Sequence, residues 1–449
     1  MTARSPVRLA LAALQMLFLI ACGSGGGSHL SPPSFTVGGT VSGLAAGQQV
    51  VLTNNGSDSI TVTANGPFTF NTPVAPSAGY AVTVSTQPTV QSCTVSNGSA
   101  ASVTANVTTV TVVCSGTALY AYVVNNGDNT VSQYTIGTDG VLSPMSTPTV
   151  TTGTFPESIT VDPTGHYAYV ANLNDNTVSQ YTIKAGGALT PNTPATVATG
   201  TGPSAVTLDA AGQYAYVLNS VDNTISQYTI GSGGALTAMS PATVMTGTQP
   251  WSITLDSTGH YAYVANHLDT TVSQYAVGAT GALTPLSPAT VTAGTHPSGI
   301  AVDPVSLYAF VANLQDNTVS QYSIGTNGVL SAQNPAIVAV GGTQPVYIAV
   351  DPTGNFAYVV DYAAGNAGAI SQFTIDSVGV LTPMAAPTVA TGKGPAWIAF
   401  NGTGQYAYVT NISDNTVSQF AIGSDGSLTP LATATVPTGV RPFAIATAY

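Results

Sequence analysis

Residues 156–183 read PESITVDPTGHYAYVANLNDNTVSQYTI, and close variants of this stretch recur along the chain. The second aromatic residue of the Tyr-Ala-Tyr-Val phrase returns at intervals of 47, 47, 47, 47, 48 and 50 residues. Its seven positions are Tyr122, Tyr169, Tyr216, Tyr263, Phe310, Tyr358 and Tyr408. A fixed period of this length indicates stacked supersecondary units, and the repeats carry strand patterns. The sequence therefore predicts an all-β fold, a seven-bladed β-propeller.

Each repeat divides into four predicted strands. Residues 156–161 form the first, which ends at an Asp-Pro-Thr-Gly turn where Pro suits a type I turn. Residues 167–172 form the second and 178–183 the third. In other repeats a Gly-x-x-Gly turn, as at Gly137 and Gly140, leads into the fourth. In the second strand large Tyr alternates with small Ala or Val, so its two faces would interlock with the two neighbouring blades. A β-solenoid, the alternative fold, would use shorter rungs.

The ends of the array predict how the ring closes. The repeats begin at Leu119 with a second strand, and the chain ends at residues 442–447 with a first strand. We therefore expect the C-terminal strand to complete blade one. This closure would remove the exposed sheet edge that an open array leaves.

The repeat also resembles known families. The phrase Tyr408-Val409-Thr410-Asn411, with variants at Tyr169, Tyr216 and Tyr263, resembles the YVTN-type repeats of microbial surface proteins. Residues 119–449 as a whole resemble the lactonase-type seven-bladed propeller family, whose enzymes include phosphogluconolactonase and a carboxymuconate cyclase. The resemblance implies the propeller fold and suggests a lactonase-type activity. It carries over no catalytic residue, because no family motif aligns with the residues that differ between repeats here.

The N-terminus predicts an exported lipoprotein. In residues 1–21, Arg4 and Arg8 precede an apolar run too short to span a bilayer, which is typical of a signal peptide. The run ends Leu-Ile-Ala-Cys22, which resembles the bacterial lipoprotein box and implies that Cys22 carries the lipid. Gly23 in place of Asp implies an outer-membrane address in a double-membraned cell. An ordinary secreted protein with a chance Cys is the alternative.

A flexible tether and a small domain are predicted between the signal peptide and the repeats. Residues 22–33 are rich in Gly and Ser and form the tether. Residues 34–116 show short alternating strands with Asn-Gly and Pro turns, and they resemble the immunoglobulin-like spacers of bacterial surface lipoproteins. Cys93 and Cys114 are expected to form a disulfide bond, which would stabilise the fold by ~3 kcal/mol. The propeller would then occupy residues 117–449.

Charge excludes one class of partner. Only 5% of the residues are charged. Beyond the signal peptide the cations are Lys184, Lys393 and Arg441, against 17 acidic residues. A net charge near −14 would repel phosphate backbones and anionic membranes, so no nucleic-acid partner is expected.

The sequence carries no catalytic signature. It lacks metalloprotease, nucleophile-elbow, phosphate-loop and Cys-x-x-Cys motifs, and Glu157 is the single glutamate. The aspartates recur with the repeat, so they are interpreted as turn-forming hydrogen-bond acceptors, and no metal or cofactor is expected. His166 and His260 occupy a variable turn position and are expected on the surface.

Function is sought where the repeats differ. Rare residue types gather around the Pro that opens the first strand, and propeller topology would place them around one mouth of the channel. The candidate ligand-site residues are Glu157, Gln249, Trp251, His296, Gln344, Tyr347, Lys393, Trp397, Arg441 and Phe443. Two structural alternatives stay open: Glu157 and Arg441 form an ion pair across the closure, and the aromatic residues plug the channel.

Two functions follow. The preferred hypothesis is a surface-anchored binding or scaffold protein whose mouth takes a sugar- or lactone-like molecule, or which meets a cell-surface partner. The alternative is a lactone hydrolase or cyclase. The sequence leaves undecided whether the protein is an enzyme.

Overall fold

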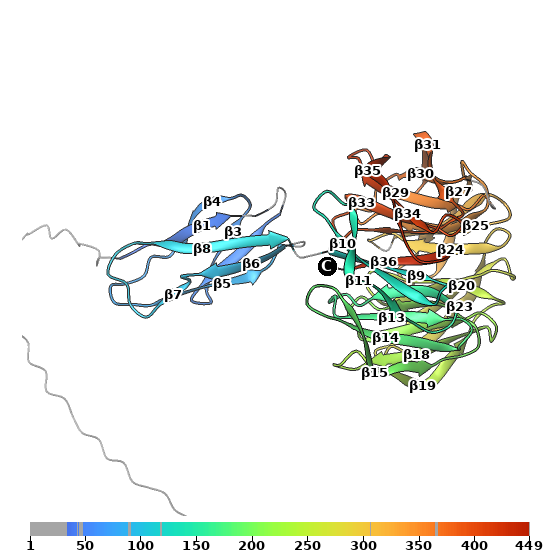
Figure 1. Cartoon of the computed structure of the whole chain (residues 1–449), viewed down its shortest axis with the longest axis horizontal. Helices are drawn as coiled ribbons and strands as arrows, with labels where there is room; N and C mark the ends of the chain where they lie inside the picture. The colour runs from blue at the N-terminus through green and yellow to red at the C-terminus, as the bar shows by residue number, and fades with distance from the viewer. Residues whose placement is uncertain are drawn as a thin grey trace, which may run out of the picture. The chain divides into compact units, whose positions relative to one another are not determined.

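The computed structural model describes residues 34–42, 44, 48–88, 91–116, 119–305, 307–363 and 367–448. Within these residues every regular element is a β-strand. They divide into two compact units, one formed mainly before the repeats and one that contains the repeats (Figure 1). The predicted signal peptide, Cys22 and the tether lie outside the described residues.

The N-terminal unit contains two four-stranded sheets, with strand orders β4-β1-β8-β6 and β3-β2-β5-β7. Their bounds are β1 (Val37–Ser42), β2 (Val50–Asn54), β3 (Asp58–Val62), β4 (Gly66–Thr69), β5 (Tyr80–Thr86), β6 (Gln91–Ser96), β7 (Ser99–Ala100) and β8 (Val107–Gly116). Strand β1 pairs in parallel with β8. Alternate apolar side chains such as Val37, Leu52 and Val110 are fully buried, as expected for sheets that cover a core on one face. The immunoglobulin-like assignment stays a prediction.

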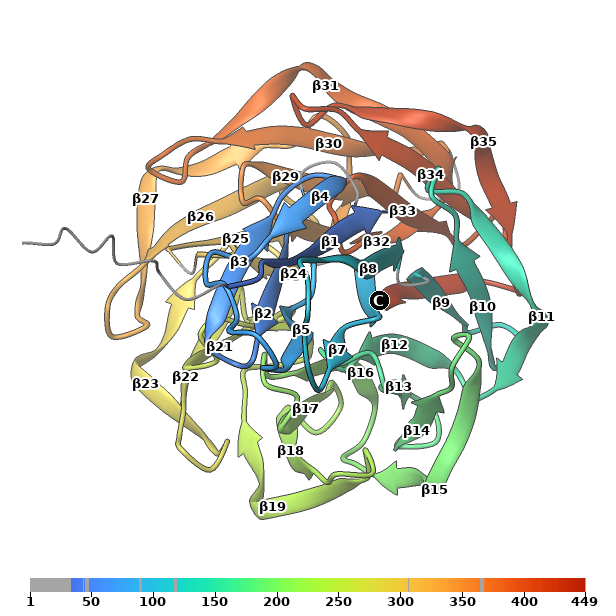
Figure 2. The ribbon, with the colours of Figure 1, turned by 90° about the vertical axis from the view of Figure 1, so that its left-hand side faces the viewer.

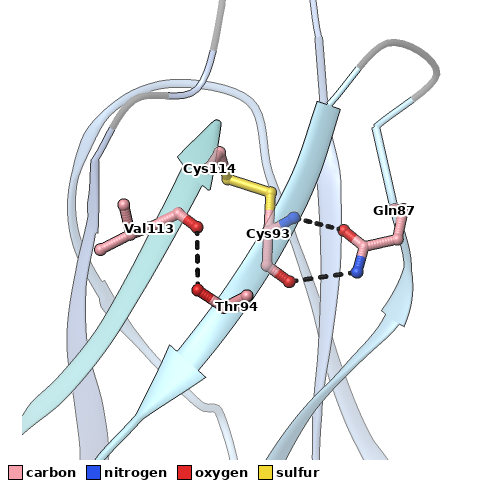
Figure 3. The surroundings of a disulfide bond; sticks show 5 residues. All are labelled: Gln87, Cys93, Thr94, Val113 and Cys114. Atoms are coloured by element: carbon pink, nitrogen blue, oxygen red, sulfur yellow. Dashed lines mark hydrogen bonds between the residues drawn. A yellow bond between two sulfur atoms is a disulfide. The ribbon is translucent and has the colours of Figure 1, made fainter. Parts of the chain in front are cut away.

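The predicted disulfide is confirmed. Cys93 of β6 and Cys114 of β8 are joined by an S–S bond of 2.04 Å (Figure 3). The side-chain amide of Gln87 brackets Cys93: Cys93 N donates to Gln87 Oε1 (2.7 Å) and Gln87 Nε2 donates to Cys93 O (3.1 Å). The bond thus links two strands of one sheet directly.

The repeats form seven four-stranded sheets, seen as blades in Figure 2. The first strands are β12 (Pro156–Val161), β16 (Pro203–Leu208), β20 (Pro250–Leu255), β24 (Pro297–Val302), β28 (Pro345–Val350), β32 (Pro395–Phe400) and β36 (Pro442–Ala448). The second strands are β9 (Leu119–Asn125), β13 (Tyr167–Asn172), β17 (Tyr214–Asn219), β21 (Tyr261–Asn266), β25 (Tyr308–Asn313), β29 (Phe356–Asp361) and β33 (Tyr406–Asn411). All four predicted strands of the repeat are therefore present.

The remaining strands complete each blade. The third strands are β10 (Thr130–Ile136), β14 (Thr177–Ile183), β18 (Thr224–Ile230), β22 (Thr271–Val277), β26 (Thr318–Ile324), β30 (Ala367–Ile375) and β34 (Thr416–Ile422). The fourth strands are β11 (Leu142–Thr151), β15 (Leu189–Ala198), β19 (Leu236–Met245), β23 (Leu283–Thr292), β27 (Leu330–Ala339), β31 (Leu381–Lys393) and β35 (Leu428–Pro437).

The predicted ring closure is confirmed. The first blade has the strand order β11-β10-β9-β36, so the C-terminal strand supplies its missing first strand. Strand β36 runs antiparallel to β9, with Ile445 opposite Val123 and Ala446 opposite Tyr122. Ala444 and Ile445 are buried in the clusters that join blade one to its neighbours.

Large and small faces interlock between blades as predicted. Tyr169 and Ala171 of blade two pack against Ala215 and Val217 of blade three. The buried Tyr169 hydroxyl donates to the backbone carbonyl of Gly234 (2.8 Å). Five other blades make the same bond, from Tyr122 to Gly187, Tyr216 to Gly281, Tyr263 to Gly328, Tyr358 to Gly426 and Tyr408 to Gly140. Each bond satisfies a hydroxyl that burial would otherwise leave unpaired.

The aspartate turns also behave as predicted. Asp162 Oδ1 accepts hydrogen bonds from the backbone nitrogens of His166 (2.7 Å) and Tyr167 (2.6 Å), closing the turn after the first strand. His166 and His260 are exposed at these turns. The turns follow the ends of the first strands, opposite the starts where the candidate site was predicted.

Candidate functional site

A backbone feature shared by all seven blades builds the rim of the mouth. The residue before the opening Pro has a positive φ in every blade, between 53° and 67°. These residues are Phe155, Gly202, Gln249, His296, Gln344, Gly394 and Arg441. Only two are glycine, although this left-handed conformation is uncommon for other residues. Such conformations persist where the surrounding structure enforces them, and they gather at functional sites.

Asparagine side chains from the preceding blade hold this rim in place. Asn129 Oδ1, for example, accepts a hydrogen bond from Phe155 N (2.8 Å). The same bond, here called the asparagine latch, joins Gly202 to Asn176, Gln249 to Asn223, Gln344 to Asn317 and Arg441 to Asn415. Before His296 the latch position is Thr270, which lacks the amide yet keeps a φ of 55°. Positive φ is a genuine outlier for a β-branched residue.

A cavity of about 360 Å³ opens at the mouth, on the side of blades four to seven and one. Aromatic and aliphatic side chains form most of its wall, with few polar groups. The wall consists of Trp251, Ser252, Ser298, Leu314, Gln344, Val346, Tyr347, Tyr362, Ala396, Trp397, Ile412, Arg441 and Phe443. Six of the ten predicted site residues are in this set. Its volume and lining match those of small-molecule sites.

The floor of this mouth cavity is a stacked aromatic pair. The rings of Tyr347 and Trp397 lie 3.9 Å apart at an interplanar angle of 23°. Both residues also line a smaller cavity of about 210 Å³, which is bordered by first strands, including Ser158 and Thr207. Burial raises the pKa of the Tyr347 hydroxyl, so it stays protonated at neutral pH. The pair thus borders two cavities, so the aromatic residues do not fill the mouth completely and the plug interpretation accounts for only part of it.

A second aromatic group stands at the rim. The indole of Trp251, 37% exposed, lies 4.3 Å from the imidazole of His267. His267 in turn stacks on His296 at 4.6 Å and 29°. Its Nδ1 lies 3.3 Å from the carbonyl oxygen of Pro297. Burial lowers the pKa of His267, so its ring is neutral at pH 7.

The charged candidates have different positions. Arg441 lines the cavity; its Nε donates to Asn126 Oδ1 (3.1 Å), and its guanidinium carbon lies 6.0 Å from the centre of the Phe155 ring. Among the described residues no ion pair joins Arg441 to Glu157, so the structural alternative of an ion pair across the closure is not present; Arg441 bonds to Asn126 instead. Burial raises the pKa of Glu157 to about 7. Lys393 is exposed and lies outside the cavity wall.

Sequence reasoning missed one ring of site residues. The residue that follows the last residue of the second strand also faces the mouth and also varies between blades. Leu314, Tyr362 and Ile412 line the cavity from this position, and His267 supports Trp251 from it. Their variation directly after an otherwise similar Tyr-Val-x-Asn phrase was the signal that could have found them.

No metal or membrane-spanning feature accompanies the site in the part of the chain that the structure describes. There, no three His, Cys, Asp or Glu side chains gather as a metal site would need. Over the same residues, no helix has the length and apolarity to cross a membrane.

A closed ring of seven four-stranded sheets with a cavity at one mouth defines a seven-bladed β-propeller with a candidate ligand site. The family described as "Lactonase, 7-bladed beta-propeller" matches residues 82–197, 152–343 and 334–442. The chain belongs to this lactonase propeller family. No curated protein matches the chain.

Solved structures share the fold at low sequence identity. A Bacteroides fragilis protein provisionally named a 6-phosphogluconolactonase is 17% identical with a TM-score of 0.63, covering 74% of this chain and 98% of its own. The periplasmic gluconolactonase of Pseudomonas aeruginosa is 18% identical with a TM-score of 0.60, covering 74% and 99%. A Lactobacillus plantarum protein gives the same identity, TM-score and coverage. At these identities the likeness concerns the fold alone.

Proposed function

We propose that this protein is an envelope-anchored binding propeller whose mouth cavity takes a small, ring-shaped ligand of sugar or lactone type. The observation that carries the proposal is the aromatic cavity of about 360 Å³, lined by six of the residues that break the sevenfold repeat. A structural hub would use the same residue in each blade, whereas a single site on a pseudo-symmetric ring must depart from the symmetry.

The lining suits a neutral or weakly anionic ring. Tyr347, Trp397 and Phe443 offer flat apolar faces, against which a ring can bury its own apolar surface. Arg441 is the one cation in the cavity wall, so it can pair with one carboxylate or polarise one carbonyl. Beyond Arg441, the described residues of the cavity wall offer no positive charge to balance a phosphate group, and the 17 acidic residues of the chain would repel it.

The first test replaces three exposed or half-buried mouth residues together: Trp251→Ala, His296→Ala and Arg441→Ala. We expect the variant to lose at least tenfold in affinity for sugars and lactones that the wild type binds, since about 1.4 kcal/mol corresponds to tenfold. Calorimetric titration against a sugar and lactone library measures this. The matched control is His166→Ala, His260→Ala and Leu307→Ala, exposed residues at the opposite turns. Equal affinities in all three proteins would contradict the proposal.

A lactone hydrolase or cyclase is the second candidate function. Family membership favours it, and so does Glu157, a carboxyl group at the mouth whose pKa burial raises to about 7. A carboxyl group with such a pKa can serve as a general acid or base near neutral pH. Assaying the same lactone panel for ring opening separates the two functions. Turnover that Glu157→Gln abolishes would establish the enzyme, and binding without turnover would establish the binding protein.

The envelope location is part of the same proposal and rests on the signal peptide and the Cys22 box. Replacing Cys22→Ala is expected to move the protein from the membrane fraction to the soluble exported fraction. Fractionation and uptake of a labelled fatty acid measure both effects. A variant that stays in the membrane fraction, together with an unlabelled wild type, would rule out the lipid anchor.

A further inference from the structure

Two aromatic platforms lie at different depths of the mouth cavity. The floor platform is the stacked pair Tyr347 and Trp397, which lines both the mouth cavity and the smaller cavity of about 210 Å³. The rim platform is Trp251, which lines only the mouth cavity and is 37% exposed. Tyr347 and Trp397 are less exposed than Trp251, so a ring placed on the floor platform is covered more than a ring placed on Trp251.

The rim platform is rigidly supported although it is exposed. His267 lies against the indole, is 8% exposed, and its Nδ1 is within reach of the Pro297 carbonyl. His296 in turn stacks on His267. A free exposed tryptophan would lose side-chain entropy on binding, and this support reduces that cost. The support is also the place where Thr270 holds a strained backbone and the asparagine latch is replaced.

We infer that the ligand is a saccharide chain of at least two residues rather than a single ring. Its terminal residue packs against the Tyr347–Trp397 pair, and the next residues leave the cavity across Trp251. This inference rests on the proposed binding function and names the class of ligand that the site takes. Pyranose rings present flat faces of C–H groups, which aromatic platforms bury without needing charge.

Charge favours a neutral chain. The sequence has 17 acidic residues against few cations, so polyanionic glycans and nucleic acids would be repelled. Arg441 is the single cation in the wall and can accommodate at most one carboxylate. Exposed hydrophobic residues elsewhere, such as Val305 and Leu307, lie outside the cavity wall and so add no further platform to it.

The test measures affinity against saccharide length. Fluorescently labelled cello-, chito-, malto- and xylo-oligosaccharides of one to six residues are titrated into the purified full chain. In at least one series we expect affinity to rise about tenfold between one residue and three, because a second aromatic contact is gained. Trp251→Ala should abolish that rise with length, whereas Trp251→Phe should keep most of it.

The outcomes separate this inference from the proposed function. Leu307→Ala, an exposed residue outside the mouth, is the matched control and should bind all lengths as the wild type does. If single sugars or lactones bind and no series gains affinity with length, the chain inference is overturned while the small-molecule site stands. If Trp251→Ala lowers the affinity of all lengths equally, the two-platform arrangement is wrong. If neither saccharides nor lactones bind, both proposals fail.

Discussion

A chain that ends at Arg441 is expected to aggregate or to lose its cooperative unfolding transition. Removing residues 442–449 takes away β36, whose backbone pairs with β9 and whose Ala444 and Ile445 are buried. The loss exposes apolar side chains of two blades and one strand edge. Two side-chain bonds also vanish: Thr410 Oγ1 to Phe443 O and Thr447 Oγ1 to Phe400 O, each 2.7 Å.

Size-exclusion chromatography and thermal unfolding measure this effect. The stability of a domain is ~5–15 kcal/mol, so the loss of a whole buried strand is comparable with the total. The graded control is Ile445→Ala, which keeps the strand and should cost about 2–5 kcal/mol. An unchanged melting temperature after the deletion would mean that blade one does not depend on the C-terminal strand.

Replacing Asp361→Asn is expected to stabilise the propeller at neutral pH. Six second strands end in Asn at this position, and β29 ends in Asp361, which is fully buried. Asp361 Oδ2 accepts a bond from Ser371 Oγ (2.6 Å), and Oδ1 has no partner. Burial raises the pKa of Asp361 to about 7, with the bond to Ser371 opposing the shift. An asparagine amide at position 361 could donate to Ser371 Oγ, as Asn313 Nδ2 donates to Ser320 Oγ in blade five.

The sign of the pH dependence follows from the raised pKa. An unfolded Asp ionises near pH 4, whereas the folded Asp361 holds its proton to about 7. Between these values the folded state binds one proton more, so stability falls as pH rises from about 4 to 7. At pH 8 the buried carboxylate costs on the order of a few kcal/mol. Asp361→Asn should therefore raise the melting temperature at pH 8 and change it much less at pH 5.

The reverse substitution is the matched control. Asn313 donates from Nδ2 to Thr318 Oγ1 (3.0 Å) and Ser320 Oγ (2.9 Å), and its Oδ1 accepts from Gly294 N (3.0 Å). Asn313→Asp should destabilise the protein at pH 8 more than at pH 5. Equal shifts of either variant at both pH values would show that the carboxyl at this position does not titrate.

The fold was predictable because short local sequence patterns determine each strand and recur in all seven blades. The Tyr-Ala-Tyr-Val phrase fixes a strand with one bulky face, and the incomplete ends of the array imply the closure by β36. The exposed position of His166 also followed from comparing repeats. Each of these inferences needs only the local sequence and the rule that neighbouring blades cover one another.

The site was only partly predictable, because it depends on side-chain directions and distances between blades. Variation around the opening Pro identified Trp251 and Trp397, but not that Trp397 stacks on Tyr347 and leaves a cavity above. His267 was missed because it lies in the turn after β21, distant in sequence from Trp251, and meets it only in three dimensions. Glu157 and Arg441 were assigned to adjacent blades, but the direction of the Arg441 side chain, toward Asn126, does not follow from the repeat.

The asparagine latch bears on how such a ring can grow by gene duplication. Asn129 lies in blade one and Phe155 lies directly before the first strand of blade two. Moving one whole blade into another protein would therefore separate these two residues. A segment that starts with a second strand and ends with the following first strand, such as residues 119–161, keeps both. Duplicating such a segment therefore adds both partners of the asparagine latch together. Blade swaps for engineering should therefore be cut at the turn between the first and second strands, which keeps the junction between two blades intact.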